Sequence, residues 1–158
     1  MKDHYYKAKV EWTGNEGKGT LNPQSYNRNH TISCNGKYDL IKASSDAAFL
    51  GDAKRYNPED LLVSAIAACH MLWYLHLCAI NNIVVTDYTD NSVGHMQETA
   101  NGSGQFKEVI LNPVIKITDL GKIEKATELH GEANKMCFIA NSCNFAIKHH
   151  PTITAEQQ

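Results

Sequence analysis

A run of twenty mostly apolar residues, 61–80, constrains the fold more than any other feature of this sequence. Only three of its residues are clearly polar: Ser64, His70 and His76. The run is long enough to span a bilayer. However, the residues that flank it, Glu59-Asp60 and Asn81-Asn82, provide no basic anchor, and two histidines in hydrocarbon would be costly. We therefore predict no membrane span but a long central helix, buried on nearly all sides of a soluble domain.

The start of this helix carries a capping signal. Asn57 is suited to the N-cap position, Pro58 to the first helical position, and Glu59 and Asp60 to the first turn. Asn57 with Asp60 approximates a capping box. These residues predict a helix that begins at Pro58 and ends near Ile80.

The rest of the chain alternates between strand and helix signals. Strand patterns occur at residues 5–12, 29–33, 38–43, 83–88, 93–99, 106–118 and 144–149. A second, amphipathic helix is predicted over residues 122–138, where Ile123, Ala126, His130, Ala133 and Cys137 share one stripe. The pattern predicts an α+β fold with a mostly antiparallel sheet. We interpret residues 1–158 as one domain whose tail, about 154–158, is loose.

Composition and charge narrow the classes of function. The net charge of −2 and the isoelectric point near 6.4 indicate neither nucleic acid nor an anionic membrane as a partner. The first six residues have no apolar core, so they do not resemble a signal peptide, and we expect a cytoplasmic protein. Five cysteines without regular spacing do not suggest a disulfide scaffold in that compartment.

Two cysteines stand out from the predicted helices. Cys69 lies in the middle of the long helix, and Cys137 ends the second helix on its core-facing stripe. A cysteine in a helix is most often a small apolar residue, yet these two point inward from helices expected to pack together. Cys143 is an alternative partner for Cys69, whereas we interpret Cys34 and Cys78 as structural.

Other catalytic or ligand-binding motifs are missing from the sequence. The eight histidines form no ligand set with metal-binding spacing, and His70 and His76 do not share a helix face. The glycines at 14, 17 and 19 lack the lysine and helix of a phosphate loop. We therefore predict neither a metal nor a cofactor.

Residues 56–69, Tyr-Asn-Pro-Glu-Asp-Leu-Leu-Val-Ser-Ala-Ile-Ala-Ala-Cys, resemble the signature of the OsmC / organic hydroperoxide resistance family. Residues 133–142, which contain Cys137, resemble the family's second cysteine motif. The resemblance implies an OsmC-like, intertwined homodimer with active sites near the subunit interface. It also implies that Cys69 is the peroxidatic cysteine, Cys137 the resolving cysteine, and Glu59 the acid that positions an arginine beside the thiolate.

The sequence departs from the family pattern in two places. Phe138 follows the second cysteine, where the family usually has proline. The family's arginine comes from the N-terminal strands and has no secure counterpart. A buried thiol needs a cation that stays charged, which favours Arg28 or Arg55 over Lys18. Arg28 is the candidate we assign.

These features predict a thiol-dependent peroxidase. Cys69 would reduce an organic hydroperoxide, the sulfenic acid would condense with Cys137, and an external dithiol, of lipoyl type or similar, would restore both thiols. Apolar neighbours such as Leu72 and Trp73 suit an organic peroxide. One alternative is an OsmC-like dimer that binds a small apolar ligand. Another is a structural dimer in which Cys69 is no more reactive than Cys34.

Overall fold

The structure, a computed structural model, describes residues 1–155. The chain divides into two compact units, Met1–Leu61 and Leu62–Gln158, and each is described by itself. The interpretation of residues 1–158 as one domain stays a prediction.

The first unit contains a small antiparallel sheet of strand order β1-β2-β3. Its strands are β1 (Lys9–Trp12), β2 (His30–Ser33) and β3 (Ile41–Ala43), followed by a 3-10 turn, η1 (Ala47–Phe49). A tight turn near Asn35-Gly36 connects β2 to β3, and Gly36 adopts φ +77°, which a residue without Cβ tolerates. This confirms the predicted hairpin. β1 is shorter than predicted, because residues 5–8 form no ladder.

Helix α1 (Pro58–Ile80) has the predicted bounds. Asn57 Oδ1 accepts the backbone N–H of Asp60 at 2.7 Å, and Asp60 Oδ2 accepts the N–H of Asn57 at 3.3 Å, so the capping box is reciprocal. Asn82, with φ +57°, ends the turn that follows the helix. By length and composition α1 is the one helix in residues 1–155 that could cross a membrane, a test that core helices also pass.

Only one stripe of α1 is buried within a single chain. Its fully buried residues follow one another at spacings of four: Ile66, His70, Tyr74 and Cys78. Leu72 and Ile80, on other faces, are 63% and 61% exposed. The sequence predicted burial on nearly all sides of α1. In a single chain, only one face of the helix is buried.

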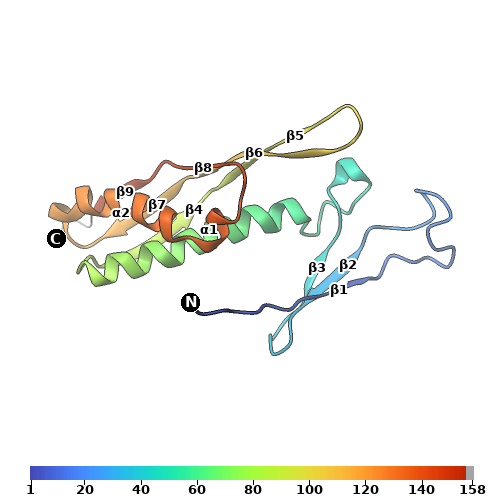
Figure 1. The fold of residues 1–158 in the computed structure, drawn as a ribbon, viewed down its shortest axis with the longest axis horizontal. Coiled ribbons are helices and arrows are strands. Elements are labelled where there is room, and N and C mark those ends of the chain that lie inside the picture. The colour runs from blue at the N-terminus through green and yellow to red at the C-terminus, as the bar shows by residue number, and fades with distance from the viewer. Residues whose placement is uncertain (156–158) are drawn as a thin grey trace. The chain divides into compact units, whose positions relative to one another are not determined.

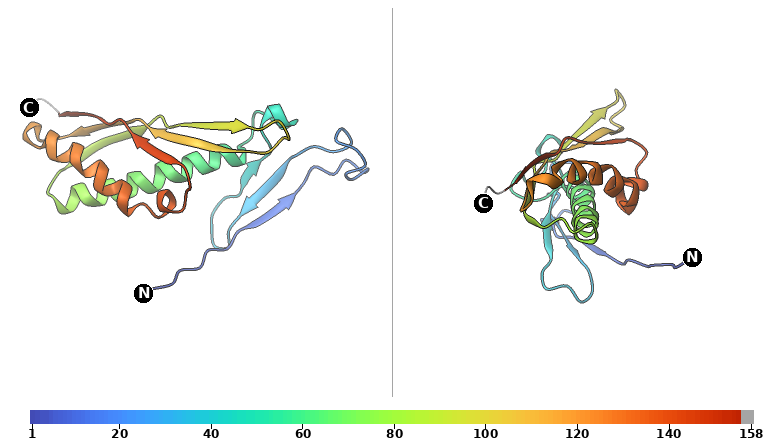
Figure 2. Two further views of the ribbon diagram at one scale, coloured as in Figure 1. Left: turned by 45° about the horizontal axis from the view of Figure 1, so that its top comes forward. Right: turned by 90° about the vertical axis from the view of Figure 1, so that its left-hand side faces the viewer.

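The second unit combines two three-stranded mixed sheets with helices. One sheet has the order β4-β7-β9 and the other the order β5-β6-β8, with β6–β8 and β7–β9 parallel and β4–β7 and β5–β6 antiparallel. The strands are β4 (Val85–Asp90), β5 (Val93–Glu98), β6 (Gly104–Leu111), β7 (Pro113–Ile117), β8 (Ala146–His149) and β9 (Thr152–Ala155). Within this unit α1 and α2 lie on the same side of the strands (Figures 1 and 2).

Two strand predictions were wrong. Residues 106–118 form two strands, because Pro113 lacks a backbone N–H and the N–H of Asn112 donates to Asp90 Oδ1 at 2.8 Å rather than to a ladder. The chain therefore passes from one sheet to the other at Asn112. Residues 154 and 155, predicted as loose tail, belong to β9, whereas residues 156–158 lie outside the described part of the chain.

Helix α2 (Ile123–Met136) follows a 3-10 turn, η2 (Leu120–Lys122), and precedes a one-turn helix, α3 (Phe138–Asn141). The predicted stripe of α2 is buried at Ala126, His130 and Ala133, together with Cys137 just beyond its end. These residues contribute to a core shared by α1, α2 and the β4-β7-β9 sheet.

Candidate functional site

The side chains of Cys69 and Cys137 lie close enough for their thiol groups to interact with each other. Cys69 lies in the middle of α1 and is half-buried, whereas Cys137 follows α2 and is 0% exposed. The inward direction predicted for both cysteines therefore brings them into contact, although they are far apart in the sequence. Both cysteines carry free thiols in this structure.

Cys137 lies at a break between two helices rather than at the end of one. Its backbone is extended, with φ −69° and ψ 108°, so α2 ends at Met136 and not at the predicted Phe138. The Cys137 sulfur accepts the backbone N–H of Ala140 at 3.3 Å and thereby caps α3. This contact fixes the direction of the thiol because the short helix and the side chain constrain one another.

The environment keeps Cys137 protonated at neutral pH. Burial, followed by the hydrogen bond to Cys69, raises the pKa of the Cys137 thiol to about 11, although the N–H of Ala140 acts in the opposite direction. Cys137 is therefore a thiol and not a thiolate at neutral pH, and the thiolate is the nucleophilic form of cysteine.

The remaining cysteines have different surroundings. Cys143 is half-buried beside Ile66, its thiol donates to the carbonyl oxygen of Ile139 at 3.3 Å, and burial raises its pKa. Cys78 is fully buried, and burial raises its pKa as well. Cys34 is exposed. Of Cys137 and Cys143, the alternatives left open by the sequence, Cys137 is the one that contacts Cys69.

Aromatic rings flank the cysteine pair. Trp73, one helical turn after Cys69 and on the same face of α1, packs edge-to-face against Phe138 with ring centroids 6.0 Å apart. Phe138, the neighbour of Cys137, remains 70% exposed. Phe138 thus contributes an accessible apolar surface next to the two thiols.

The charged residues assigned from the sequence lie in the first unit. Arg28 Nη1 donates to the carbonyl oxygens of Pro23 and Tyr26 at 2.6 and 2.8 Å, and its guanidinium lies 4.4 Å from the Tyr26 ring centroid. Arg55 pairs with Asp52 at 3.3 Å. Glu59 Oε2 is buried with no hydrogen-bond partner among the described residues. A buried carboxylate oxygen of this kind could accept a hydrogen bond from a cationic side chain. The roles of Arg28 and Glu59 beside Cys69 stay predictions.

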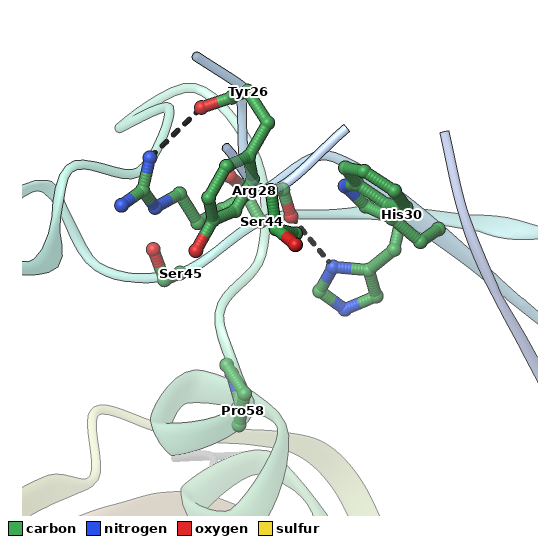
Figure 3. Close-up of a pocket in the computed structure, with 8 residues that line it drawn as sticks. Tyr26, Arg28, His30, Ser44, Ser45 and Pro58 are labelled. Atoms are coloured by element: carbon green, nitrogen blue, oxygen red, sulfur yellow. Dashed lines mark hydrogen bonds between the residues drawn. The ribbon is translucent and has the colours of Figure 1, made fainter. Parts of the chain in front are cut away.

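Arg28 also lines a cavity of about 340 Å³ within the first unit (Figure 3). The lining residues are Trp12, Thr20, Tyr26, Arg28, His30, Ser44, Ser45 and Pro58. Figure 3 shows the Arg28 guanidinium at the carbonyl oxygen of Tyr26, and His30 Nδ1 bonded to the carbonyl oxygen of Arg28 at 2.9 Å. Such a cavity is large enough for a small, largely apolar molecule.

A buried histidine cluster that includes His70, the neighbour of Cys69, was not predicted from the sequence. His70 Nε2 and His130 Nδ1 are 2.9 Å apart, and the His149 ring lies 5.7 Å from that of His70. The only usable signal was the position of His130 on the core-facing stripe of α2. In residues 1–155 no group of three or more histidine, cysteine or acidic side chains is arranged to hold a metal ion.

Comparison with known proteins identifies the family and the fold. The sequence model of the family described as "OsmC-like protein" matches residues 51–154, which include α1, both cysteines and the strands of the second unit. No curated protein matches the chain.

Solved structures of the same fold extend the comparison beyond this match. An OsmC-like protein of unknown function from Vibrio cholerae is 28% identical, with a TM-score of 0.85, and the match covers 95% of this chain and 100% of that one. An organic hydroperoxide resistance protein from Elizabethkingia anophelis is 20% identical, with a TM-score of 0.68 and coverage of 99% and 100%. The Bacillus subtilis organic hydroperoxide resistance protein OhrB is 22% identical, with a TM-score of 0.60 and coverage of 93% and 98%.

Proposed function

Because this chain belongs to the OsmC-like family, we propose that it is a thiol-dependent peroxidase that reduces organic hydroperoxides to alcohols. The observation that carries the proposal is the contact between a half-buried Cys69 and a buried, protonated Cys137. Structural matches to organic hydroperoxide resistance proteins support the same class of activity. In this proposal Cys69 is the peroxidatic residue and Cys137 the resolving residue.

The first step oxidises Cys69. Its thiolate attacks one peroxide oxygen, an S–O bond forms as the O–O bond breaks, and the alkoxide leaves and takes up a proton to become the alcohol. The sulfur loses two electrons and becomes a sulfenic acid.

The second and third steps restore the enzyme. The Cys137 sulfur attacks the Cys69 sulfenic sulfur, an S–S bond forms, and the hydroxyl leaves as water with the proton from Cys137. The N–H of Ala140 stabilises charge on the Cys137 sulfur as that proton leaves. An external dithiol, of lipoyl type or similar, then exchanges with the disulfide, becomes oxidised itself and returns both thiols.

The substrate class follows from the surface beside the thiols. Trp73 and the exposed Phe138 provide apolar contacts that a hydroperoxide with a hydrocarbon group can use and hydrogen peroxide cannot. We therefore assign organic hydroperoxides as substrates. Glu59 and Arg28 belong to the proposal as the acid and the arginine that activate Cys69.

The proposed assembly is a homodimer in the cytoplasm. The exposed apolar faces of α1, including Leu72 and Ile80, are what a second copy of the chain would cover. Light scattering after gel filtration tests this assembly: twice the chain mass of 17.6 kDa is expected. A monomer would remove the dimer from the proposal.

The experiment that tests the activity counts free thiols before and after one equivalent of cumene hydroperoxide. Wild type should lose two thiols per chain within minutes, and Cys69→Ser should lose none. Cys143→Ser is the matched control and should still lose two. No loss in wild type within minutes would reject the peroxidase.

One observation favours a second function, the binding of a small apolar ligand. The cavity around Trp12 and Tyr26 is built within the first unit, and Arg28 is already engaged there by two carbonyl oxygens and a ring. This function would be supported if the chain does not react with hydroperoxide and an added apolar ligand quenches the fluorescence of Trp12. Trp12→Phe, which leaves Trp73 as the other tryptophan, identifies the signal.

A further inference from the structure

The His70–His130 pair joins α1 to α2 in the core. The two side chains are 1% and 0% exposed, and their ring nitrogens are 2.9 Å apart. Tyr74 stacks on the His130 ring at 3.9 Å, and the His149 ring lies 6.0 Å from it. The rings on either side leave the pair sealed from solvent.

The protonation of the pair leaves an unsatisfied hydrogen-bonding group whichever tautomer is present. A neutral imidazole has one N–H and one lone pair, and the shared bond uses the N–H of one ring and the lone pair of the other. The remaining nitrogens, His70 Nδ1 and His130 Nε2, are buried without a partner among the described residues. One of them therefore carries a buried N–H without a partner, which is energetically unfavourable. Two apolar residues in their place would avoid that cost.

The pair is placed where it controls the geometry of the thiols. His70 follows Cys69 directly in α1, and His130 precedes Cys137 by two turns on the buried stripe of α2. A disulfide forms only when the two Cα atoms lie roughly 4.4–6.8 Å apart with suitably directed Cβ atoms. Apolar packing is not directional, whereas a hydrogen bond fixes both distance and angle. The histidine bond therefore limits sliding and rotation of α2 on α1 next to the thiols.

We propose that the His70–His130 hydrogen bond positions Cys137 for disulfide closure with Cys69. His70 and His130 are positioning residues: they act through the helices and touch neither thiol nor substrate. This proposal rests on one part of the proposed function, namely that Cys69 and Cys137 form a disulfide. It does not depend on which oxidant forms that disulfide.

The bond persists across the physiological range of pH. Burial, together with His149, lowers the pKa of His70 to about 4. Burial, together with His70 and His149, lowers that of His130 to about 3. Both rings are therefore neutral at pH 7, so one donates and the other accepts.

The test compares His130→Asn with His130→Leu. An asparagine amide can replace Nδ1 as the partner of His70, whereas leucine fills similar space without a hydrogen bond. The stability of the Cys69–Cys137 disulfide is measured at equilibrium in mixtures of reduced and oxidised glutathione, with peptide mapping to identify the bond. The effective concentration of the two thiols should fall at least tenfold in His130→Leu and stay within threefold of wild type in His130→Asn.

One further readout separates positioning from a purely structural role. The rate at which an organic hydroperoxide oxidises Cys69, measured by dimedone trapping in a Cys137→Ser background, should change less than twofold when His130→Leu is added, because without Cys137 no disulfide closure competes for the sulfenic acid. If His130→Leu does not fold, His70→Gln and His70→Leu form the equivalent pair, since a glutamine amide can replace Nε2. Equal effective concentrations in wild type and the leucine variant, or an equal fall in both variants of a pair, would overturn the proposal.

The glutathione measurement also separates this proposal from the peroxidase. A wild-type chain that forms the Cys69–Cys137 disulfide with oxidised glutathione but does not react with hydroperoxide would reject the peroxidase and leave the positioning proposal to be decided by the variants. A wild-type chain that forms no such disulfide with glutathione would overturn the positioning proposal itself.

Discussion

The cysteine pair and the histidine pair both join α1 to α2 and begin at adjacent residues, yet their surroundings differ. Cys69 is half-buried and lies beside the exposed Phe138, whereas His70 and His130 are closed off on every side. Reagents can therefore reach Cys69 but neither histidine. The comparison teaches that one helix contact can be divided into a part that reacts and a part that holds its geometry.

The largest effect is expected from Cys137→Ser. Without the buried thiol no intramolecular disulfide can form, so peroxide should consume one thiol per chain and stop at the Cys69 sulfenic acid. Turnover with a dithiol such as dihydrolipoamide should fall by at least tenfold. Intact-mass spectrometry after dimedone treatment measures the trapped species. A Cys137→Ser chain that still loses two thiols would assign the resolving role to Cys143.

A smaller effect, on stability, is expected from acid. The pKa values of His70 and His130 in the folded chain, about 4 and about 3, lie below the ordinary histidine value of 6.5. Between pH 6.5 and 4 the unfolded chain binds more protons than the folded one, so the free energy of unfolding falls as the pH falls. The limiting slope is about 1.4 kcal/mol per pH unit for each histidine.

Urea denaturation at a series of pH values measures this slope. The double variant His70→Gln/His130→Asn removes both titrating groups and should flatten the dependence between pH 6.5 and 4. His4→Gln, a change at an exposed histidine, is the control and should leave the slope unchanged. A double variant with the wild-type slope would show that other groups, such as the neighbouring His149, cause the acid sensitivity.

Local signals in the sequence predicted one part of the site. The capping box at Asn57 and the bounds of α1 depend on neighbouring residues, and the stripe of α2 depends on helical periodicity. The inward direction of Cys69 and Cys137 followed from these patterns and from the family resemblance. Their meeting therefore agrees with the prediction, although their catalytic roles stay predictions.

Long-range features could not be predicted in the same way. His70 and His130 are sixty residues apart, and no local pattern states which residues of two packed helices face each other. The passage from β6 to β7 at Asn112 depends on a contact with Asp90 from a distant strand. Arg28 is a different case, because its partners Pro23 and Tyr26 are near it in the sequence, but no periodic pattern predicts the loop conformation that brings their carbonyl oxygens to the guanidinium.

The smallest effect is expected from Phe138→Ala, which changes the accessible side of the cysteine pair. Phe138 directly follows Cys137, and its ring packs against Trp73 with ring centroids 6.0 Å apart. An aromatic contact of this kind contributes about 0.5–1.5 kcal/mol, so the rate constant for cumene hydroperoxide should fall about two- to tenfold. The rate constant for hydrogen peroxide should not change, because that peroxide has no hydrocarbon group to contact the ring. Stopped-flow tryptophan fluorescence gives both rate constants, and the exposed Phe49→Ala is the control. An equal fall in the rate constants for both peroxides would mean that Phe138 holds Cys137 in position rather than contacting the substrate. Phe138 would then belong with the histidine pair, which holds the geometry of the contact between α1 and α2, and not with the reactive cysteines.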